Sequence, residues 1–355
     1  MGRWIAYLSL CVALNAASEG PALSASDVVN AADHSAGRVA PGEIVVLYPR
    51  NAGPAVLAGA QLDSDGRAAT MLGDTRVWFD GIAAPLAYAV SGQVCAVVPY
   101  AVAGRKTTQV VAEYQGVRSP AVELTVVPSA PALFTLDSTG QGQAAMLNEK
   151  GCCNSAPNPA VRGAFAALYA TGAGQTTPSG IDGAMAAFDR AADYPVPALP
   201  VRVMVGGRPA EIQYAGAAPH AVAGLLQVNF RVPADAPTSD AVPLVLMVGD
   251  ARSPDGVTMA VRSAVERVLV AEPDAVVRGW LTRVLAGAGY DVTVARNGRE
   301  AVARAGEHTI DLVICSRSIP EAERTEGMRA ILAMRPARWA PVRCEPPICW
   351  EPRRC

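Results

Sequence analysis

Aromatic side chains are scarce in this sequence, at 5% of 355 residues, although hydrophobic residues make up 51%. The apolar content is therefore mostly Ala and Val, which bury little area per residue. Glycine and proline are abundant instead, with 32 and 28 copies, which favours many turns between short strands. This composition predicts a mainly β protein with thin, β-branched cores.

Histidine is also rare, and the residues form no recognisable catalytic set. His34, His220 and His308 lie in unrelated segments, whereas a Ser-His-Asp or Cys-His site needs a histidine beside both a nucleophile and an acid. Asp63 and Asp65 in LDSDGRA resemble part of a calcium loop, but the pattern lacks a third ligand and a closing Glu. We therefore predict a plain turn there, and no enzyme activity, no cofactor and no confident metal site.

Neither sign of charge dominates, because the net charge is −2 and the pI is near 6. Such a balance provides no overall field to attract nucleic acid or an anionic membrane. The apolar run at residues 4–14 is shorter than the roughly 20 residues that span a bilayer, and no later run reaches that length. We expect neither a nucleic-acid partner nor a membrane span.

The first residues have the layout of a secretory signal peptide. Arg3 precedes the apolar run, and small residues follow at 16–18. We predict a signal peptide or a disordered N-terminus over residues 1–25, and an extracytoplasmic location, either secreted or at the cell surface. A buried N-terminal strand or helix is the alternative interpretation.

The eight cysteines form no disulfide framework and no zinc pattern. Cys95, Cys152 and Cys153 are too few and too irregular for a disulfide scaffold, although one bond from Cys95 to either of the others stays open. The other positions are Cys11 and a C-terminal group, Cys315, Cys344, Cys349 and Cys355. The spacing of that group matches no zinc-binding pattern.

Short strands and turns alternate through residues 39–127, and a second segment repeats the first. RVWFDGIAAPLAY at 76–88 matches RVMVGGRPAEIQY at 202–214. GQVCAVVP matches LQVNFRVP, and VRSP matches ARSP, both 134 positions later. The repeat predicts two tandem immunoglobulin-like β-sandwich modules, over residues 26–130 and 131–263, in preference to a closed barrel.

Further blocks make a family resemblance specific, among them VAPGEIVVLYPRNAGP, APALFTLDSTGQGQAAMLN and LYATGAGQ. Over about residues 39–261 the chain resembles an uncharacterised C-terminal domain family that is abundant in Solibacter-type acidobacteria. The family occurs at the ends of exported proteins and has no established activity, so the resemblance implies a fold and a location. Cys95 stands where the family usually has Asn, and His220 where it usually has Gly.

The pattern changes after residue 263 to alternating apolar strands and helices, which predicts a parallel sheet. This partial flavodoxin-like βαβαβα segment, over residues 264–336, resembles a truncated, degenerate response-regulator receiver domain. In receivers two acidic residues hold Mg²⁺ and an Asp accepts a phosphoryl group. The resemblance places Glu272 and Asp274 at the metal pocket and Ser316 at the acceptor position. A neutral serine hydroxyl is expected to be inactive there.

Residues 337–355 contain four prolines and three cysteines without a period, which predicts a disordered tail. Two functions follow from these patterns. The favoured one is a non-enzymatic, extracytoplasmic binding, adhesion or structural module, with a receiver remnant that is not phosphorylated and an unknown protein or glycan partner at the cell surface. The alternative is a cytoplasmic signalling protein that takes part in a phosphorelay with a sensor kinase.

Overall fold

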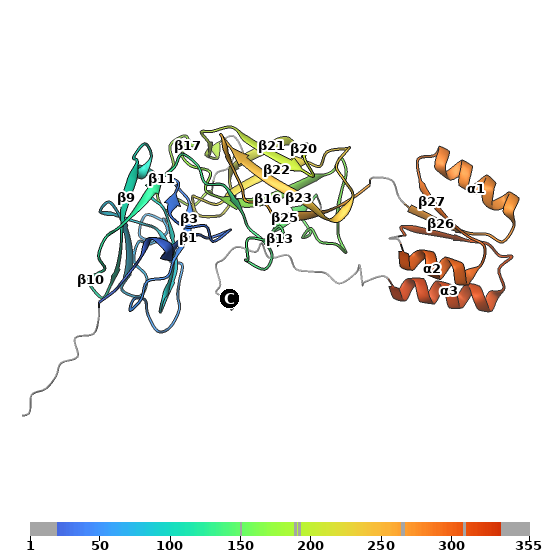
Figure 1. The fold of residues 1–355 in the computed structure, drawn as a ribbon, viewed down its shortest axis with the longest axis horizontal. Helices are drawn as coiled ribbons and strands as arrows, with labels where there is room; N and C mark the ends of the chain where they lie inside the picture. Colours follow the sequence, from blue (N-terminus) through green and yellow to red (C-terminus); the bar gives the residue numbers. More distant parts are fainter. Residues whose placement is uncertain are drawn as a thin grey trace, which may run out of the picture.

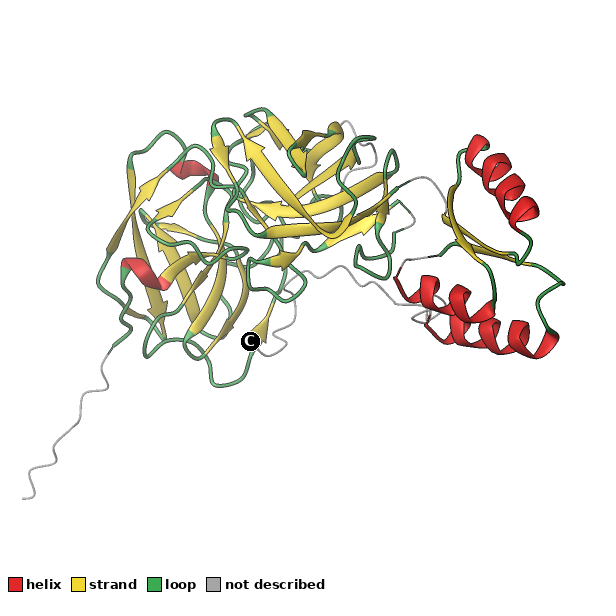
Figure 2. Cartoon of the chain, turned by 45° about the vertical axis from the view of Figure 1, so that its right-hand side comes forward, coloured by secondary structure: helices red, strands yellow, loops and turns green. Residues whose placement is uncertain are grey.

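The computed structural model describes residues 20–149, 151–187, 190, 193–263, 267–307 and 310–334. Strands dominate the part before residue 263, where the described helices are two short 3-10 segments, Ala25–Asp27 and Tyr100–Val102 (Figures 1 and 2). The α-helices follow after residue 267. The prediction of a mainly β protein is confirmed.

Two sheets form the first β unit, which extends from residue 20 to residue 127. Its strands are β1 (Val28–Asn30), β2 (Arg38–Val39), β3 (Ile44–Leu47), β4 (Ala58–Gly59), β5 (Thr75–Phe79), β6 (Ile82–Ala83), β7 (Leu86–Val90), β8 (Gln93–Val97), β9 (Thr107–Tyr114), β10 (Val117–Arg118) and β11 (Val122–Val126). One sheet has the order β1-β3-β8-β7-β4, and the other β2-β11-β9-β5-β6 with β10 on β9.

Period-two alternation places one row of side chains from each sheet in the first core. Val77 and Phe79 on β5 are fully buried, whereas Trp78 between them is only half-buried on the opposite face. Leu86 on β7 and Val94 on β8 meet them from the other sheet in the same cluster. The core is thus built mostly from Val, Ala and Leu, as the composition predicts.

The second β unit occupies residues 128–263. Its strands are β12 (Ala132–Leu133), β13 (Gly142–Gln143), β14 (Met146–Asn148), β15 (Ala160–Val161), β16 (Phe165–Thr171), β17 (Thr176–Thr177), β18 (Val196–Pro197), β19 (Val201–Val205), β20 (Arg208–Pro209), β21 (Glu211–Ala217), β22 (Leu226–Arg231), β23 (Ser239–Val248), β24 (Ala251–Arg252) and β25 (Val257–Arg262). The main sheets have the orders β12-β16-β22-β21 and β13-β25-β23-β19-β20, and β17 pairs with β18 separately. A second core lies between the two main sheets.

The matched sequence blocks lie at equivalent positions in the two units. β5, β7 and β8 of the first unit correspond to β19, β21 and β22 of the second, in sheets of matching order. A register shift that marks a β-bulge falls between Leu86 and Tyr88, and again between Ile212 and Tyr214. Each residue of the second bulge follows its counterpart by 126 positions. The structure therefore shows one strand arrangement twice.

The repeated Ser-Pro motif has the same role in both copies. The Ser119 hydroxyl accepts a hydrogen bond from the Ala112 amide at 3.1 Å, and the Ser253 hydroxyl accepts one from the Leu246 amide at 3.0 Å. In return, the Ser119 amide donates to the Ala112 carbonyl, and the Ser253 amide donates to the Leu246 carbonyl. Both serines are buried. A buried amide without a partner costs about 1–3 kcal/mol, which explains why a small hydroxyl side chain occurs at this position in both copies.

The first β unit begins earlier than the sequence analysis predicted. Ala22 forms a β-bridge with Arg50, and Leu23 joins the first core at 9% exposure. The Asp27 carboxylate accepts a hydrogen bond from the Ser24 amide at 2.8 Å. Residues 20–25 are therefore folded onto the unit, and the predicted boundary at residue 25 is wrong. Most of the predicted signal peptide, with Cys11, lies outside the described residues.

A three-stranded parallel sheet follows residue 263. Its elements are β26 (Arg267–Ala271), α1 (Ala275–Gly287), β27 (Asp291–Ala295), α2 (Gly298–Glu307), β28 (Leu312–Cys315) and α3 (Glu321–Met334). The sheet order is β27-β26-β28, and α1 lies on one face while α2 and α3 pack together on the other (Figure 1). Their relation to receiver domains stays a prediction. His308 and the predicted tail at 337–355 lie outside the described residues.

None of the described helices is both long enough and apolar enough to cross a bilayer.

Candidate binding site at the junction of the two β units

The two β units meet along a buried junction. The Ile44 amide of β3 donates to the Thr171 hydroxyl at the end of β16, at 2.7 Å. The Asn30 side-chain amide donates to the Ala130 carbonyl at 3.3 Å. Phe134 packs against the outer face of the first sheet, in a cluster that contains Val46, Tyr88 and Cys95. Direct hydrogen bonds and apolar contacts thus join the units.

The sequence of β8 explains why this face is covered. Cys95 and Val97 point away from the first core, yet both are buried at 2% exposure. Their counterparts in the second unit, 134 positions later, are Asn229 and Arg231, which are not buried. Apolar residues at outward positions need a cover, whereas an amide and a guanidinium remain in contact with water. The first unit therefore presents the apolar face to its neighbour.

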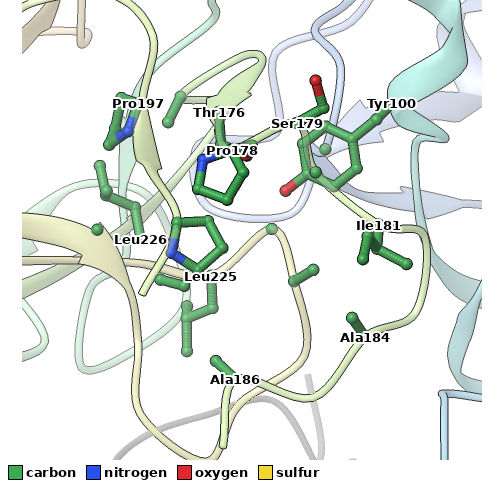
Figure 3. Close-up of a pocket in the computed structure, with 18 of the residues that line it drawn as sticks. Tyr100, Thr176, Pro178, Ser179, Ile181, Ala184, Ala186, Pro197, Leu225 and Leu226 are labelled. Carbon is green, nitrogen blue, oxygen red and sulfur yellow. The ribbon is translucent and has the colours of Figure 1, made fainter. Parts of the chain in front are cut away.

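A cavity of about 190 Å³ lies at this junction (Figure 3). The first unit contributes Gly42 and Tyr100, and the second contributes the remaining wall. Most lining residues are small, proline or aliphatic, including Ala173, Gly174, Pro178, Gly180, Ile181, Ala184, Met185, Ala186, Pro195, Pro197, Gly216, Ala217, Ala223, Gly224, Leu225 and Leu226. Thr176, Ser179 and Asp193 add polar groups.

Tyr100 is held at the junction between two glycines. A Cβ atom on Gly42 or on Gly180 would lie 2.5 Å from ring atoms of Tyr100, so neither position accepts a larger side chain without a shift. Gly42 also has a φ of +70°, which disfavours other residues. The Tyr100 amide donates to the Asp182 carboxylate at 2.8 Å, a contact between residues of different units. The ring is therefore fixed by both units together.

The Tyr100 hydroxyl is the central polar group of the cavity. The residue is 6% exposed, and Figure 3 shows its hydroxyl directed toward the space between the lining residues. Among the described residues, no hydrogen-bond partner of this hydroxyl is observed. Burial, reinforced by the Asp182 carboxylate, raises the pKa of Tyr100 to about 12. The phenol is thus neutral at physiological pH and can both donate and accept a hydrogen bond.

Asp182 is the acidic group nearest to the Tyr100 backbone. Burial raises its pKa above the ordinary value, while the hydrogen bond from the Tyr100 amide and the nearby Arg67 act in the opposite direction. Its carboxylate is used to join the units.

No protein-family model and no curated protein matches this chain. Among solved structures it is similar to the extracellular region of plexin A4, at 14% identity and a TM-score of 0.23 over 73% of this chain and 20% of that one. It is also similar to SGBP-B from a xyloglucan utilization locus of Bacteroides uniformis, at 10% identity and a TM-score of 0.22 over 67% of this chain and 49% of that one. The I9–I11 tandem from titin has a TM-score of 0.17 at 8% identity, over 67% of this chain and 68% of that one. At such TM-scores these likenesses carry no argument about a ligand or a partner.

The residues singled out in the β sequence do not converge on this cavity. The Asp63 carboxylate accepts hydrogen bonds from the amides of Asp65 and Arg67, both at 2.9 Å, so it closes the predicted turn. His34 contacts the Ser138 carbonyl through Nε2 at 2.9 Å. His220 is exposed in the loop before β22. Asp63, His34 and His220 are absent from the cavity lining.

The cysteines of the β units are also dispersed. Cys95 is buried in β8, whereas Cys152 is exposed and Cys153 is half-buried. No disulfide joins cysteines within the described ranges, so the bond from Cys95 that the sequence left open is not formed. In the same ranges, no group of three or more potential metal ligands is found.

The three receiver-like positions lie together at the carboxyl ends of β26 and β28. The Glu272 carboxylate accepts from the Asp274 amide at 2.9 Å and contacts the Ser318 hydroxyl at 3.5 Å. Ser318 and Ser316 are hydrogen-bonded through their hydroxyls at 2.6 Å. The Asp274 carboxylate caps α1 by accepting from the amides of Val276 and Val277, and these bonds lower its pKa. Asp274 therefore serves the helix N-terminus.

We expect no phosphorylation of this edge. With acetyl phosphate and Mg²⁺, the full chain should show no label on Ser316 above the level of the Ser316→Ala variant, because the neutral hydroxyl is paired with Ser318 and no described carboxylate or histidine is hydrogen-bonded to it directly. Mass spectrometry of tryptic peptides measures the label. Stoichiometric labelling of Ser316 or Asp274 would instead favour the phosphorelay.

Sequence reasoning did not identify Tyr100, and its signal was present. The alignment of the two copies places Ala234 opposite Tyr100, after the shared Val-Pro pair. Aromatic residues are rare in both copies, so a tyrosine in one copy where the other has alanine indicates that this position has a different role in the first unit. Asp182, however, lies 82 positions away along the chain, so no local pattern connects the two residues.

Proposed function

We propose that residues 20–263 form a non-enzymatic binding module whose recognition site is the junction of the two β units. The single observation that carries this proposal is the apolar cavity walled by both units, with the Tyr100 hydroxyl directed into it. A concave, mostly apolar pocket with a few convergent polar groups is the usual form of a ligand site. The fixed position of Tyr100 means that the site is formed before a ligand binds.

The proposal extends to location and partner. The signal-like pattern at residues 1–18 supports an extracytoplasmic module, whose partner is a protein or a glycan at the cell surface. In the same proposal the two units are separate sandwich modules of immunoglobulin type, and residues 264–336 are a receiver remnant without phosphotransfer. The phosphorelay of the alternative proposal is tested by the acetyl phosphate experiment above.

A thermal-shift screen of the full chain tests the binding function. The library should contain oligosaccharides, short peptides and small aromatic molecules. We expect at least one compound to raise the unfolding temperature of the wild-type protein and not that of Ala184→Leu, because Ala184 lines the cavity and a leucine would fill part of it. Ala187→Leu is the matched control, since Ala187 is exposed on the same segment and does not line the cavity. Stabilisation that is equal in all three proteins, or absent, would exclude this site.

A further inference from the structure

We propose that the junction cavity binds one aromatic ring that carries a neutral polar group, such as a phenol. This inference rests on the proposed binding function and assigns the chemical class of its ligand. Four properties of the cavity carry it: the size, the walls, the unpartnered hydroxyl and the local charge.

The size of the cavity suits a single ring. A cavity of about 150 Å³ lined by apolar side chains can hold benzene. The junction cavity, at about 190 Å³, has room for one ring with one or two substituents. At most one ring of an oligosaccharide would fit in it.

The walls present flat apolar surfaces. Pro178, Pro195 and Pro197 contribute pyrrolidine rings to these walls. Figure 3 shows Pro178 and Pro197 on the same side of the cavity as Leu226, opposite Tyr100 and Ile181. Flat, rigid walls match the faces of a planar ring, which gains dispersion energy from many simultaneous contacts.

The Tyr100 hydroxyl defines the polar part of the ligand. Tyr100 as a whole is 6% exposed, no hydrogen-bond partner of its hydroxyl is observed among the described residues, and the hydroxyl oxygen is not one of the fully buried unpaired atoms, so it is open to the cavity. A ligand that excludes water from this hydroxyl has to supply a hydrogen bond in its place, which a hydroxyl or an amine can do. A sugar ring carries many hydroxyls and would leave most of them unpaired against proline and leucine. One polar group per ring is therefore favoured.

The local charge excludes anions. Asp193 lines the cavity and Asp182 lies behind Tyr100, whereas no lysine, arginine or histidine is among the described lining residues. An anionic ligand would meet Asp193, and no cation among the described lining residues would compensate; Arg67, which acts on Asp182, does not line the cavity. The polar group of the ligand is therefore not an anion, which agrees with a neutral phenol.

Such a ring has two possible sources. It is either a free aromatic molecule or the side chain of a tyrosine on a partner polypeptide. Both share the phenol-like chemistry, and they differ in whether the mouth of the cavity also admits a peptide backbone.

Titration of the ¹⁵N-labelled full chain, followed by two-dimensional NMR, tests the inference. The probes are p-cresol, toluene, 4-hydroxybenzoate and N-acetyl-tyrosinamide, and the readout is the shift of the amide signals of Gly42, Gly180 and Gly224. We expect p-cresol to move these signals, with at least tenfold weaker binding of 4-hydroxybenzoate. Binding of N-acetyl-tyrosinamide would identify a polypeptide as the source of the ring. If p-cresol binds and N-acetyl-tyrosinamide does not, the source is a free aromatic molecule.

Three variants make the test specific to the cavity. Tyr100→Phe keeps the ring between the two glycines and removes only the hydroxyl, so it should weaken p-cresol about threefold to tenfold and leave toluene unchanged. Ala184→Leu should abolish binding of both, and Ala187→Leu should leave both unchanged. Absence of p-cresol binding, or an equal effect of Tyr100→Phe on both probes, would overturn the inference. If the thermal-shift screen then yields a ligand of another class, and Ala184→Leu prevents its binding, the proposed binding function remains supported although this inference is wrong.

Discussion

Replacing Phe230 by Ala is expected to lower the free energy of unfolding of the second β unit by about 3–5 kcal/mol, the usual cost of removing a buried aromatic ring. Phe230 is fully buried in β22, in the cluster that contains Val203, Leu244 and Met259. Phe230 is the only aromatic residue among the described members of this cluster, so no other ring in it can fill the space. Differential scanning calorimetry should show the transition of this unit roughly 10 °C lower.

Arg231→Ala is the matched control for that variant. Arg231 is the next residue on β22 and points away from the core, where it contacts the Phe165 ring at 4.3 Å and the Glu211 carboxylate at 3.4 Å. Exposed contacts of this kind contribute about 1 kcal/mol or less. A larger loss from Arg231→Ala than from Phe230→Ala would show that the alternation along β22 is reversed.

The stability of the first β unit should fall as the pH rises from 4.5 to about 8, because of Glu43. This residue is 1% exposed and accepts hydrogen bonds from the Asn30 side chain at 2.8 Å and the Ala40 amide at 2.6 Å. Burial outweighs these bonds and raises the pKa of Glu43 from 4.5 to about 8. Between these values the unfolded chain releases a proton that the folded protein retains, so ionisation favours unfolding.

The expected slope is about 1.4 kcal/mol for each pH unit within that window. The contribution is fully present below pH 4.5 and is lost as the pH rises through 8. Urea unfolding at several pH values, followed by tryptophan fluorescence, measures it; of the five tryptophans, Trp78 lies in the first β unit. Glu43→Gln should flatten the dependence, whereas Glu123→Gln, at an exposed position on β11, should retain it. Equal slopes in the wild type and Glu43→Gln would contradict the assignment.

The strands of the β units were predictable because their signals are local. Alternation in TRVWF and the turn residues that follow it set both the strand and its hairpin, and the second copy repeats them at β19. Even the bulge at Leu86 and Tyr88 recurs with the repeat. Patterns of this kind depend on neighbouring residues and not on a distant segment.

The junction was not predictable in the same way. Cys95 and Val97 are apolar at outward positions, which indicates a cover, but nothing near them in the sequence identifies what covers them. The contact from Tyr100 to Asp182 joins residues of different units, and the start of the first unit depends on the bridge from Ala22 to Arg50. Such features depend on how distant folded segments contact each other. The alternation of apolar and polar residues within one segment does not specify those contacts.

Hydrogen exchange of the full chain, compared between Phe79→Ala and Phe230→Ala, tests most directly whether the repeated segments each form their own core. Phe79 and Phe230 are both fully buried, one in each cluster. Phe230→Ala should speed exchange in β16, β22 and β23 and leave β5, β9 and β11 as protected as in the wild type, and Phe79→Ala should do the reverse. Faster exchange of both sets of strands in either variant would show one merged core and contradict the account.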